Sequence, residues 1–288
     1  MNINLALNKS YTILRGKSRT YKLDSEIILS HVLNKQNRFE LFSDLNYILK
    51  AKEKSLFFDK IKERKKLKPV SKIINKKSFW NFDIDVSKNT LIPRPETEVL
   101  IDIVCSKINK ESRIYFLDIG CGSGCISLSL LEHFKNSRSL AFDISKDAIL
   151  NTNININKYN FLSRIKILHA DLFKFKTDKK FDLIISNPPY LKLSKYINLE
   201  TSIKLFEPKL ALVGDNQDGL SFYKQIINNF KCKLKLNGYF AFEIGDYQFN
   251  IIERMLKLNG FIIEEKYKLV NHQIRCILAK KIKNYTLQ

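Results

Sequence analysis

The chain has 288 residues and is 44% hydrophobic, which allows a sizeable core and excludes a globally disordered protein. No apolar run approaches the roughly 20 residues that span a bilayer, and the first residues lack the apolar stretch of a secretory signal, so we expect a cytoplasmic protein with no membrane partner. The net charge of +21 would suit a nucleic-acid surface, but most of the cations are Lys, and abundant Asn, Ile, Tyr and Phe indicate AT-rich codons. We therefore expect nucleic-acid binding to be at most weak and non-specific.

The first part of the chain, residues 1–70, is predicted to form a small helical domain. Apolar residues recur there at helical spacing, and Asp24 or Ser25 is expected to cap a helix that carries the apolar residues 27–33. A basic run over residues 62–68 suits the last turn of a further helix, which Pro69 closes.

Residues 71–92 are predicted to form a β-hairpin connector, because the apolar residues from Trp80 onward alternate with a period near two. Pro95 is expected in the first turn of the next helix, where its missing N–H costs nothing.

Residues 93–288 are predicted to form an α/β domain, because apolar strands alternate with helices. Such alternation indicates a mostly parallel sheet that is covered on both faces. The last two strands have no helix between them, so we expect an antiparallel hairpin. The expected strands are residues 114–119, 140–143, 165–168, 181–186, 238–244, 261–263 and 274–278.

The first strand ends in a glycine-rich loop, Asp118-Ile119-Gly120-Cys121-Gly122-Ser123-Gly124, which opens a helix. Glycines there let a ligand approach the backbone closely. The G-x-G-x-G spacing differs from the G-x-G-x-x-G of dinucleotide sites, so a pyrophosphate is not the expected ligand. Asp118 is expected either to bind an ammonium group of the ligand or to brace the loop. Cys121 and Cys125 have no partner Cys or His pair, so we expect free thiols and no metal.

Two further strands end in acidic residues. Asp143 follows the glycines by about twenty residues, where a carboxylate can accept both hydroxyls of a ribose. Asp171 is expected to accept an adenine amino group, while Leu172 or Phe173 covers the ring. The alternative roles are a helix cap for Asp143 and a cap or a turn for Asp171. Carboxylates beside an apolar slot favour a cationic sulfonium cofactor, S-adenosylmethionine.

The fourth strand ends in Asn187-Pro188-Pro189-Tyr190. Two prolines remove two backbone donors and stiffen the turn, so carbonyl oxygens remain as acceptors. The Asn187 side-chain oxygen and the Pro188 carbonyl can hold both hydrogens of a planar NH2 group, and Tyr190 can stack on it. Holding the group in this way points the nitrogen lone pair at the sulfonium methyl. The alternative is an ordinary proline turn. Glu243 and the segment 206–212 are further candidates to border the acceptor site.

Taken together, these segments resemble the bacterial peptide chain release factor N5-glutamine methyltransferases, the PrmC/HemK family. The resemblance covers almost the whole chain, and a Gly and a Glu usual in the connector are replaced by Asn75 and Ser78. The matching segments are Asp24-Ser25-Glu26, Phe79-Trp80, Leu91-Ile92-Pro93-Arg94-Pro95-Glu96-Thr97-Glu98, the glycine loop, Asp143, Asn187-Pro188-Pro189-Tyr190, Phe206-Glu207-Pro208 and Arg275.

The resemblance implies a Rossmann-like class I methyltransferase, here with seven strands, preceded by a helical substrate-recognition domain. We expect the protein to be a monomer. The resemblance also implies methylation of the glutamine amide in the Gly-Gly-Gln loop of release factors, in support of translation termination. The alternatives are a ribosomal-protein glutamine methyltransferase and an adenine-N6 methyltransferase of nucleic acid. The implied cofactor residues are Gly120, Cys121, Gly122, Ser123, Gly124, Asp143, Asp171 and Leu172, and we expect Asp118 and Asn187 to contact the cofactor as well. The implied substrate-binding residues are Asn187, Pro188, Pro189 and Tyr190, of which Asn187, Pro188 and Tyr190 are the expected catalytic residues.

Overall fold

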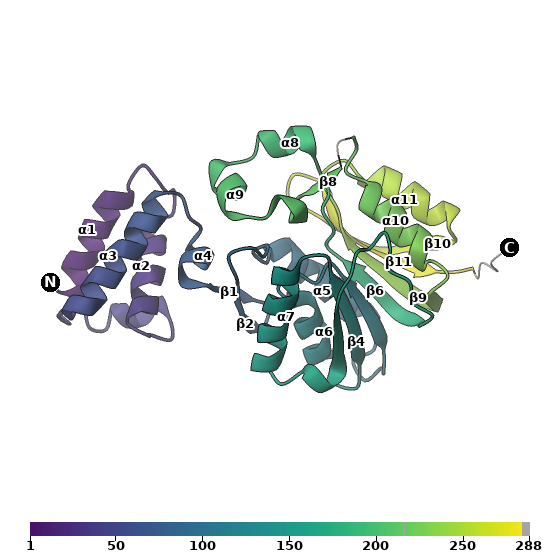
Figure 1. Cartoon of the computed structure of the whole chain (residues 1–288), viewed down its shortest axis with the longest axis horizontal. Helices are drawn as coiled ribbons and strands as arrows, with labels where there is room; N and C mark the ends of the chain where they lie inside the picture. Colours follow the sequence, from purple (N-terminus) through teal and green to yellow (C-terminus); the bar gives the residue numbers. More distant parts are fainter. Residues whose placement is uncertain (216, 284–288) are drawn as a thin grey trace. The chain divides into compact units, whose positions relative to one another are not determined.

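The computed structural model describes residues 1–215 and 217–283, and Figure 1 labels most of its helices and strands. The chain forms two compact units. One holds residues 1–76 with residues 200–206, and the other holds residues 77–199 with the described residues from 207 onward. No helix in the described residues is long and apolar enough to cross a membrane. The functional division at residues 70 and 92 stays a prediction.

The first unit is helical, as the apolar spacing predicted. Buried residues at helical spacing, such as Ile3, Leu7 and Leu14 of α1, pack against Leu29 of α2 and Phe57 of α3 in one cluster. Each such side chain contributes about 1.5–3 kcal/mol through burial. The elements are α1 (Ile3–Leu14), α2 (Tyr21–Val32), η1 (Arg38–Leu41), α3 (Ala51–Lys65), α4 (Val70–Ile74) and α9 (Thr201–Phe206).

The predicted cap of the second helix is wrong. Helix α2 begins at Tyr21, so Asp24 lies inside its first turn. Its carboxylate accepts hydrogen bonds from Ser18 Oγ (2.6 Å) and Thr20 Oγ1 (2.9 Å), and it forms an ion pair with Arg64 (2.7 Å). The acid therefore ties α2 to α3 instead of capping α2.

The predicted hairpin is present, but it is shorter than the apolar pattern indicated. Residues 70–74 form α4, and only β1 (Lys76–Phe79) and β2 (Phe82–Asp85) are strands. Trp80 lies in the turn between them with a positive φ of 51°. The hairpin is fixed to the α/β unit by Asn151 and Asn155, whose side-chain nitrogens donate to the Asp85 carbonyl at 2.7 and 2.9 Å.

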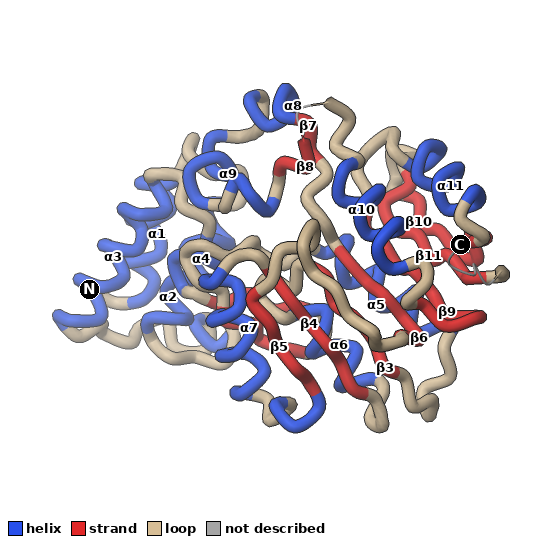
Figure 2. The backbone as a smooth tube through the Cα atoms, turned by 45° about the vertical axis from the view of Figure 1, so that its right-hand side comes forward, coloured by secondary structure: helices blue, strands red, loops and turns tan. Residues whose placement is uncertain are grey.

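The second unit contains the predicted seven-stranded sheet, whose strands lie side by side in Figure 2. The order is β10-β11-β9-β6-β3-β4-β5, and the four pairs from β9 to β5 are parallel: β9 with β6, β6 with β3, β3 with β4, and β4 with β5. The last two strands form the expected antiparallel hairpin, and β11 is also antiparallel to β9. The bounds are β3 (Tyr115–Ile119), β4 (Arg138–Asp143), β5 (Ile165–His169), β6 (Phe181–Ser186), β9 (Leu234–Glu243), β10 (Phe261–Lys268) and β11 (Ile274–Lys281).

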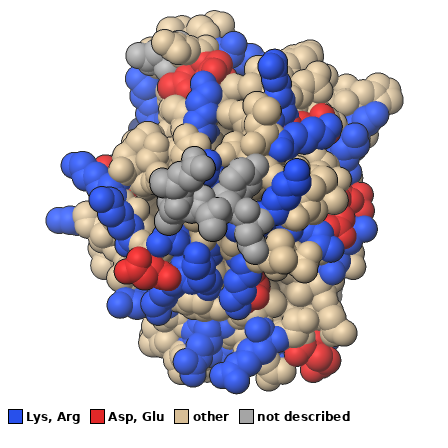
Figure 3. Space-filling model, turned by 90° about the vertical axis from the view of Figure 1, so that its right-hand side faces the viewer, with Lys and Arg blue, Asp and Glu red and all other residues tan. Residues whose placement is uncertain are grey.

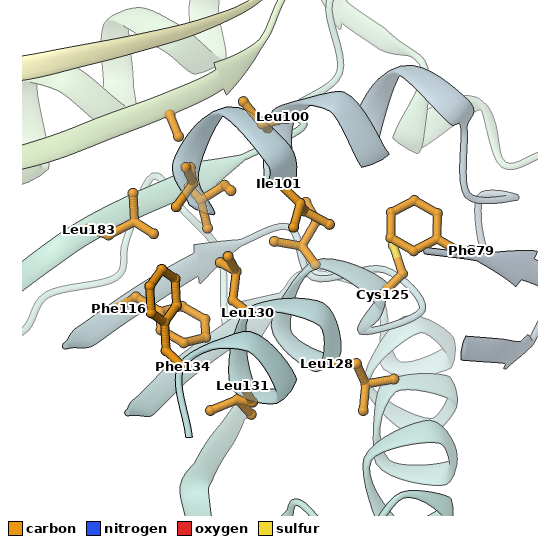
Figure 4. Packing of buried hydrophobic residues seen from close by; sticks show 14 of the residues in the cluster. Phe79, Leu100, Ile101, Phe116, Cys125, Leu128, Leu130, Leu131, Phe134 and Leu183 are labelled. Carbon is orange, nitrogen blue, oxygen red and sulfur yellow. The ribbon is translucent and has the colours of Figure 1, made fainter. Parts of the chain in front are cut away.

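Helices cover both faces of this sheet because alternate strand residues face opposite sides. Phe116 of β3 joins the cluster that α5 and α6 complete, whereas its neighbour Leu117 joins the cluster of α10 and α11. Figure 4 shows the first cluster, in which Leu100 and Leu130 pack with Phe116 and Leu183. The helices are α5 (Pro95–Lys107), α6 (Cys125–His133), α7 (Lys146–Lys158), α10 (Ser221–Phe230) and α11 (Phe249–Leu258). Pro95 occupies the first turn of α5, as predicted.

The segment after Asn187 contains short elements that the sequence pattern did not indicate. A two-stranded parallel pair holds its ends together, with Leu191 opposite Val213. The short elements of this segment include these two strands and the helices between them, and one more lies earlier in the chain. They are β7 (Leu191–Lys192), α8 (Leu193–Ile197), η3 (Lys209–Ala211), β8 (Val213–Asp215) and, earlier in the chain, η2 (Leu162–Arg164).

Basic side chains are spread over the face that Figure 3 displays, with acidic side chains interspersed among them. Several of the exposed Lys residues pair with acids close in sequence, as Lys62 does with Asp59 at 2.9 Å. Surface pairs of this kind contribute little to stability. This distribution resembles a solvated surface more than a single nucleic-acid groove.

Candidate active site

A cavity of about 340 Å³ lies at the carboxyl ends of β3, β4 and β6 and just beyond β5. This edge is where ligands bind in open α/β sheets, because the loops that leave the strands meet there. The cavity brings together most of the predicted site residues. Those that line it are Gly120, Cys121, Gly122, Ser123, Asp143, Asp171, Leu172, Asn187, Pro188 and Pro189. Asp118, Gly124 and Tyr190 are not among the lining residues.

The glycine loop exposes its backbone to the cavity. Gly120 and Gly122 have φ angles of +72° and +59°, in the left-handed region that favours glycine. A Cβ at Gly120 would meet no heavy atom within 4 Å, so the space beside its backbone is open. At Gly124, by contrast, a Cβ would lie 3.0 Å from Thr152 Cγ2 of α7. A side chain at Gly124 is therefore disfavoured both by its φ of +79° and by its packing against α7, whereas Gly120 leaves room at the cavity.

Asp143 joins the glycine loop to the start of α7. Its carboxylate accepts from the backbone N–H of Gly122 at 3.0 Å and from that of Ser145 at 2.8 Å. The cap of α7 is Ser145, so the alternative role of Asp143 as that cap is wrong. Burial raises the pKa of Asp143, while the two backbone donors oppose the rise. The carboxylate thus fixes the loop and also lines the cavity.

Asp118 lies at the end of β3, beneath the glycine loop, and is fully buried. Its Oδ2 accepts from Ser127 Oγ at 2.6 Å, while its Oδ1 has no partner among the described residues. Burial raises the pKa of Asp118 to about 7. A buried carboxylate with only one of its two oxygens hydrogen-bonded is stabilised when a cation lies nearby or when it takes up a proton.

Asp171 closes the turn that its alternative role predicted, because its Oδ1 accepts from Phe173 N at 2.9 Å. The same carboxylate lines the cavity next to Leu172. Phe173 also lines it and meets Phe222 of α10 edge to face, with ring centroids 5.6 Å apart. This side of the cavity is therefore an apolar slot with a carboxylate at its edge.

The side chain of Asn187 is hydrogen-bonded to Thr97 of α5. Its Nδ2 donates to Thr97 Oγ1 at 3.1 Å, and Thr97 Oγ1 donates to Glu243 Oε2 at 2.5 Å. The Asn187 Oδ1 accepts no hydrogen bond from the described part of the chain. Pro188 and Pro189 follow and have no N–H to donate. The turn therefore presents acceptors and no backbone donors at these two positions.

Tyr190 supports this turn from outside the cavity. Its hydroxyl donates to Glu243 Oε1 at 3.4 Å, and its carbonyl accepts from Gln248 Nε2 at 3.0 Å. The Arg275 guanidinium lies over the ring at 5.4 Å from its centroid. Burial raises the pKa of Tyr190. The predicted stacking of Tyr190 on an acceptor group stays a prediction.

An ion pair links two of the segments that the resemblance rests on. Arg94 Nη2 lies 2.6 Å from Glu207 Oε1, so the residue before α5 is tied to the segment that follows Asn187. Pro208, Leu210 and Ala211 of that segment line the cavity, as expected. Glu243 does not line it. No described histidine is a lining residue either.

Sequence reasoning missed several residues at the cavity. Thr97 and Arg94 stand in the segment 91–98, which supported the resemblance but was assigned no role. Ile144 follows Asp143 directly, and an apolar residue just after a predicted ribose-binding acid is a usable signal. Phe222 offered no signal, because its position depends on how α10 packs against the sheet.

Comparison with known proteins supports the two-part organisation. A model of the PrmC N-terminal domain matches residues 6–74, and a model of the methyltransferase small domain matches residues 96–207. A methyltransferase from Pyrococcus furiosus has a similar structure, with a TM-score of 0.52, 18% identity, and coverage of 78% of this chain and 98% of that one. At that identity the likeness shows the fold alone.

Full-length relatives are more informative. A release factor glutamine methyltransferase from Clostridium acetobutylicum is 37% identical over 97% of this chain and 98% of its own length. One from Caulobacter vibrioides is 31% identical over 97% of this chain and 98% of its own length. The likeness therefore spans both compact units.

Proposed function

Since this chain belongs to the release factor glutamine methyltransferase family, we propose that it methylates the glutamine side-chain amide nitrogen in the Gly-Gly-Gln motif of peptide chain release factors. The methyl donor is S-adenosylmethionine, and the modification supports translation termination. The observation that carries the proposal is the Asn187 turn, which offers fixed acceptors and no backbone donor from its prolines at the wall of the cavity.

The lining of the cavity fits a cationic nucleoside cofactor better than a polyphosphate. Asp143 and Asp171 supply negative charge, and Arg94 is already paired with Glu207. A phosphate group would need free cations or donors. The open backbone at Gly120 leaves room for the ligand's close approach. When bound, this cofactor supplies an electrophilic methyl group on its sulfonium.

We assign the cofactor contacts by residue chemistry. Asp143 would accept the ribose hydroxyls with lone pairs that its two backbone donors leave free. Asp171 would accept the adenine amino group beside the apolar surface of Leu172. Asp118 would balance the ammonium group of the methionine part across the glycine loop, which would relieve its unfavourable burial.

The acceptor amide needs orientation more than a base. Its nitrogen is a weak nucleophile because the lone pair is delocalised into the carbonyl. Asn187 Oδ1 and the Pro188 carbonyl would each accept one hydrogen of the NH2 group, which aims the lone pair at the methyl carbon. The same two oxygens face the positive charge that develops on the nitrogen, and they stabilise it. Neither oxygen removes a proton before the transfer. As the nitrogen bonds to the methyl carbon, the carbon–sulfur bond would break and the neutral thioether would leave, and the nitrogen would afterwards release one hydrogen as a proton to water.

The test compares three acceptors in one assay with methyl-labelled cofactor: a release factor, a ribosomal protein and nucleic acid. We expect label on the release factor alone, and we expect it to disappear when the glutamine of the Gly-Gly-Gln motif is replaced by glutamate. Label on the ribosomal protein, or label only on nucleic acid, would contradict the proposal. All three acceptors must be compared because each offers an NH2 group with the same two donors.

A further inference from the structure

Thr97 stands between Asn187 and Glu243 in a chain of three side chains. The carboxylate of Glu243 can only accept, so the single hydroxyl hydrogen of Thr97 is committed to it at 2.5 Å. Toward Asn187, the Thr97 oxygen can then act only as an acceptor. It must receive a hydrogen from the amide Nδ2, which lies 3.1 Å away. The amide oxygen of Asn187 is therefore turned away from Thr97.

The environment keeps this chain of hydrogen bonds dry. Thr97 is 3% exposed and Glu243 is 1% exposed, so water does not compete for the bonds. The charged groups around Glu243 are Arg94 and Glu96 at the start of α5 and Arg275 on β11. The titratable groups Tyr190, Tyr223 and Cys276 also face Glu243. Two cations against one other anion favour the ionised carboxylate, and burial opposes it.

We propose that Thr97 is a positioning residue, whose hydroxyl, ordered by ionised Glu243, locks the Asn187 amide with its oxygen toward the acceptor nitrogen. The inference rests on the proposed function, because it supplies the orientation which that chemistry requires. Without the lock, the amide can rotate by half a turn and present hydrogens to the NH2 group. The two sets of hydrogen-bond donors then repel each other, and the substrate amide loses one of the two hydrogen bonds that orient it.

Protonation of Glu243 releases the lock. A protonated carboxyl can donate to Thr97, which frees the Thr97 hydrogen to bond the Asn187 oxygen and so favours the wrong amide orientation. Burial raises the pKa of Glu243 above its ordinary value. Turnover should therefore fall on acidification before the pH reaches the ordinary range of a glutamate.

The experiment compares Thr97→Val, which keeps the shape and removes the hydroxyl, with Thr97→Ser, which keeps the hydroxyl. We expect Thr97→Val to lower kcat about 10- to 100-fold through misorientation, with unchanged affinity for S-adenosylmethionine and a folded protein by thermal melting. Thr97→Ser should restore most of kcat. Ser129→Ala is the matched control, since it removes a buried hydroxyl whose hydrogen bond within the described residues goes to the Cys125 carbonyl of its own helix, at 2.9 Å, and its kcat should equal that of the parent.

The inference fails if folded Thr97→Val keeps full kcat, or if Thr97→Ser is as impaired as Thr97→Val. If Thr97→Val does not fold, the pH profile of kcat for the parent enzyme decides. A profile that stays flat down to the ordinary pKa of glutamate would overturn the lock, as would a fall that disappears in Asp118→Asn at saturating cofactor, because Asp118 also has a raised pKa. A fall above the ordinary pKa of glutamate that persists in Asp118→Asn supports the lock. Failure of the parent enzyme to label a release factor would instead sink the proposed function, so the two failures are distinguishable.

Discussion

At the scale of single residues, the site is built from polar groups whose partners are limited by burial. Asp118 is the clearest case, because one of its carboxylate oxygens has no partner among the described residues. Leaving a buried polar atom unpaired is costly unless a ligand or a proton satisfies it. We infer that this carboxylate destabilises the protein when no cofactor is bound and increases its affinity for a cationic ligand.

The unfavourable burial of the ionised Asp118 carboxylate predicts how the stability of the protein depends on pH. Burial raises the pKa of Asp118 from 3.8 to about 7, so the folded state retains a proton that the unfolded chain releases. As pH rises between these values, the free energy of unfolding without cofactor should fall by on the order of 1 kcal/mol per pH unit. Above the folded pKa, the fall should stop.

Urea denaturation of the parent and of Asp118→Asn at about pH 5 and about pH 8 measures this difference. The Asn variant keeps an oxygen for Ser127 but cannot ionise, so it serves as the reference for all other titrating groups. Equal changes in the two proteins between these conditions would show that Asp118 does not carry the raised pKa.

At the scale of elements, the long apolar strands could be predicted, while short and cross-chain features could not. The run at β3 is mostly apolar, is buried on both faces and is followed by glycines, so both its type and its end are visible in sequence. β7 has only two residues and offers no period to detect. The bond between Thr97 and Asn187 joins residues 90 apart, and only the docking of α5 brings them together.

The glycine loop gives a prediction at this scale. Gly120 and Gly16 both have positive φ, +72° and +77°, and at both positions a Cβ would meet nothing within 4 Å. Replacing either by alanine should cost about 1 kcal/mol of stability through backbone strain. Only Gly120 lines the cavity, so only Gly120→Ala should weaken cofactor binding.

Calorimetric titration with S-adenosylmethionine, together with denaturation of both variants, separates the two effects. The Gly16→Ala variant controls for strain, because that glycine lies in the helical unit just after α1. Unchanged cofactor affinity in Gly120→Ala would mean that the ligand does not approach this backbone.

At the scale of the whole molecule, composition and architecture carry different weight. The net charge of +21 is the most conspicuous feature of the composition. The family membership nevertheless rests on sequence similarity along the whole chain and not on the charge. Basic and acidic side chains are mixed on the face in Figure 3. A high positive charge affects solubility and non-specific binding, and it is not by itself evidence of function.

The two compact units explain why the sequence divided clearly into a helical part and an alternating part. Each unit buries its own apolar cluster, so each carries its own period of hydrophobic residues. Residues 200–206 are an exception to this division along the chain. They group with the helical unit, although they lie within the part of the sequence where strands and helices alternate. The role of residues 1–70 in substrate recognition stays a prediction.

The most direct measurement is the single-turnover rate of methyl transfer by Asn187→Ala, taken with cofactor and release factor both saturating. The account predicts a cofactor dissociation constant close to that of the parent and a transfer rate lower by about 10²- to 10³-fold, since one fixed acceptor for the amide hydrogens is gone. A variant that binds cofactor poorly but transfers the methyl group at the parent rate once bound would contradict it.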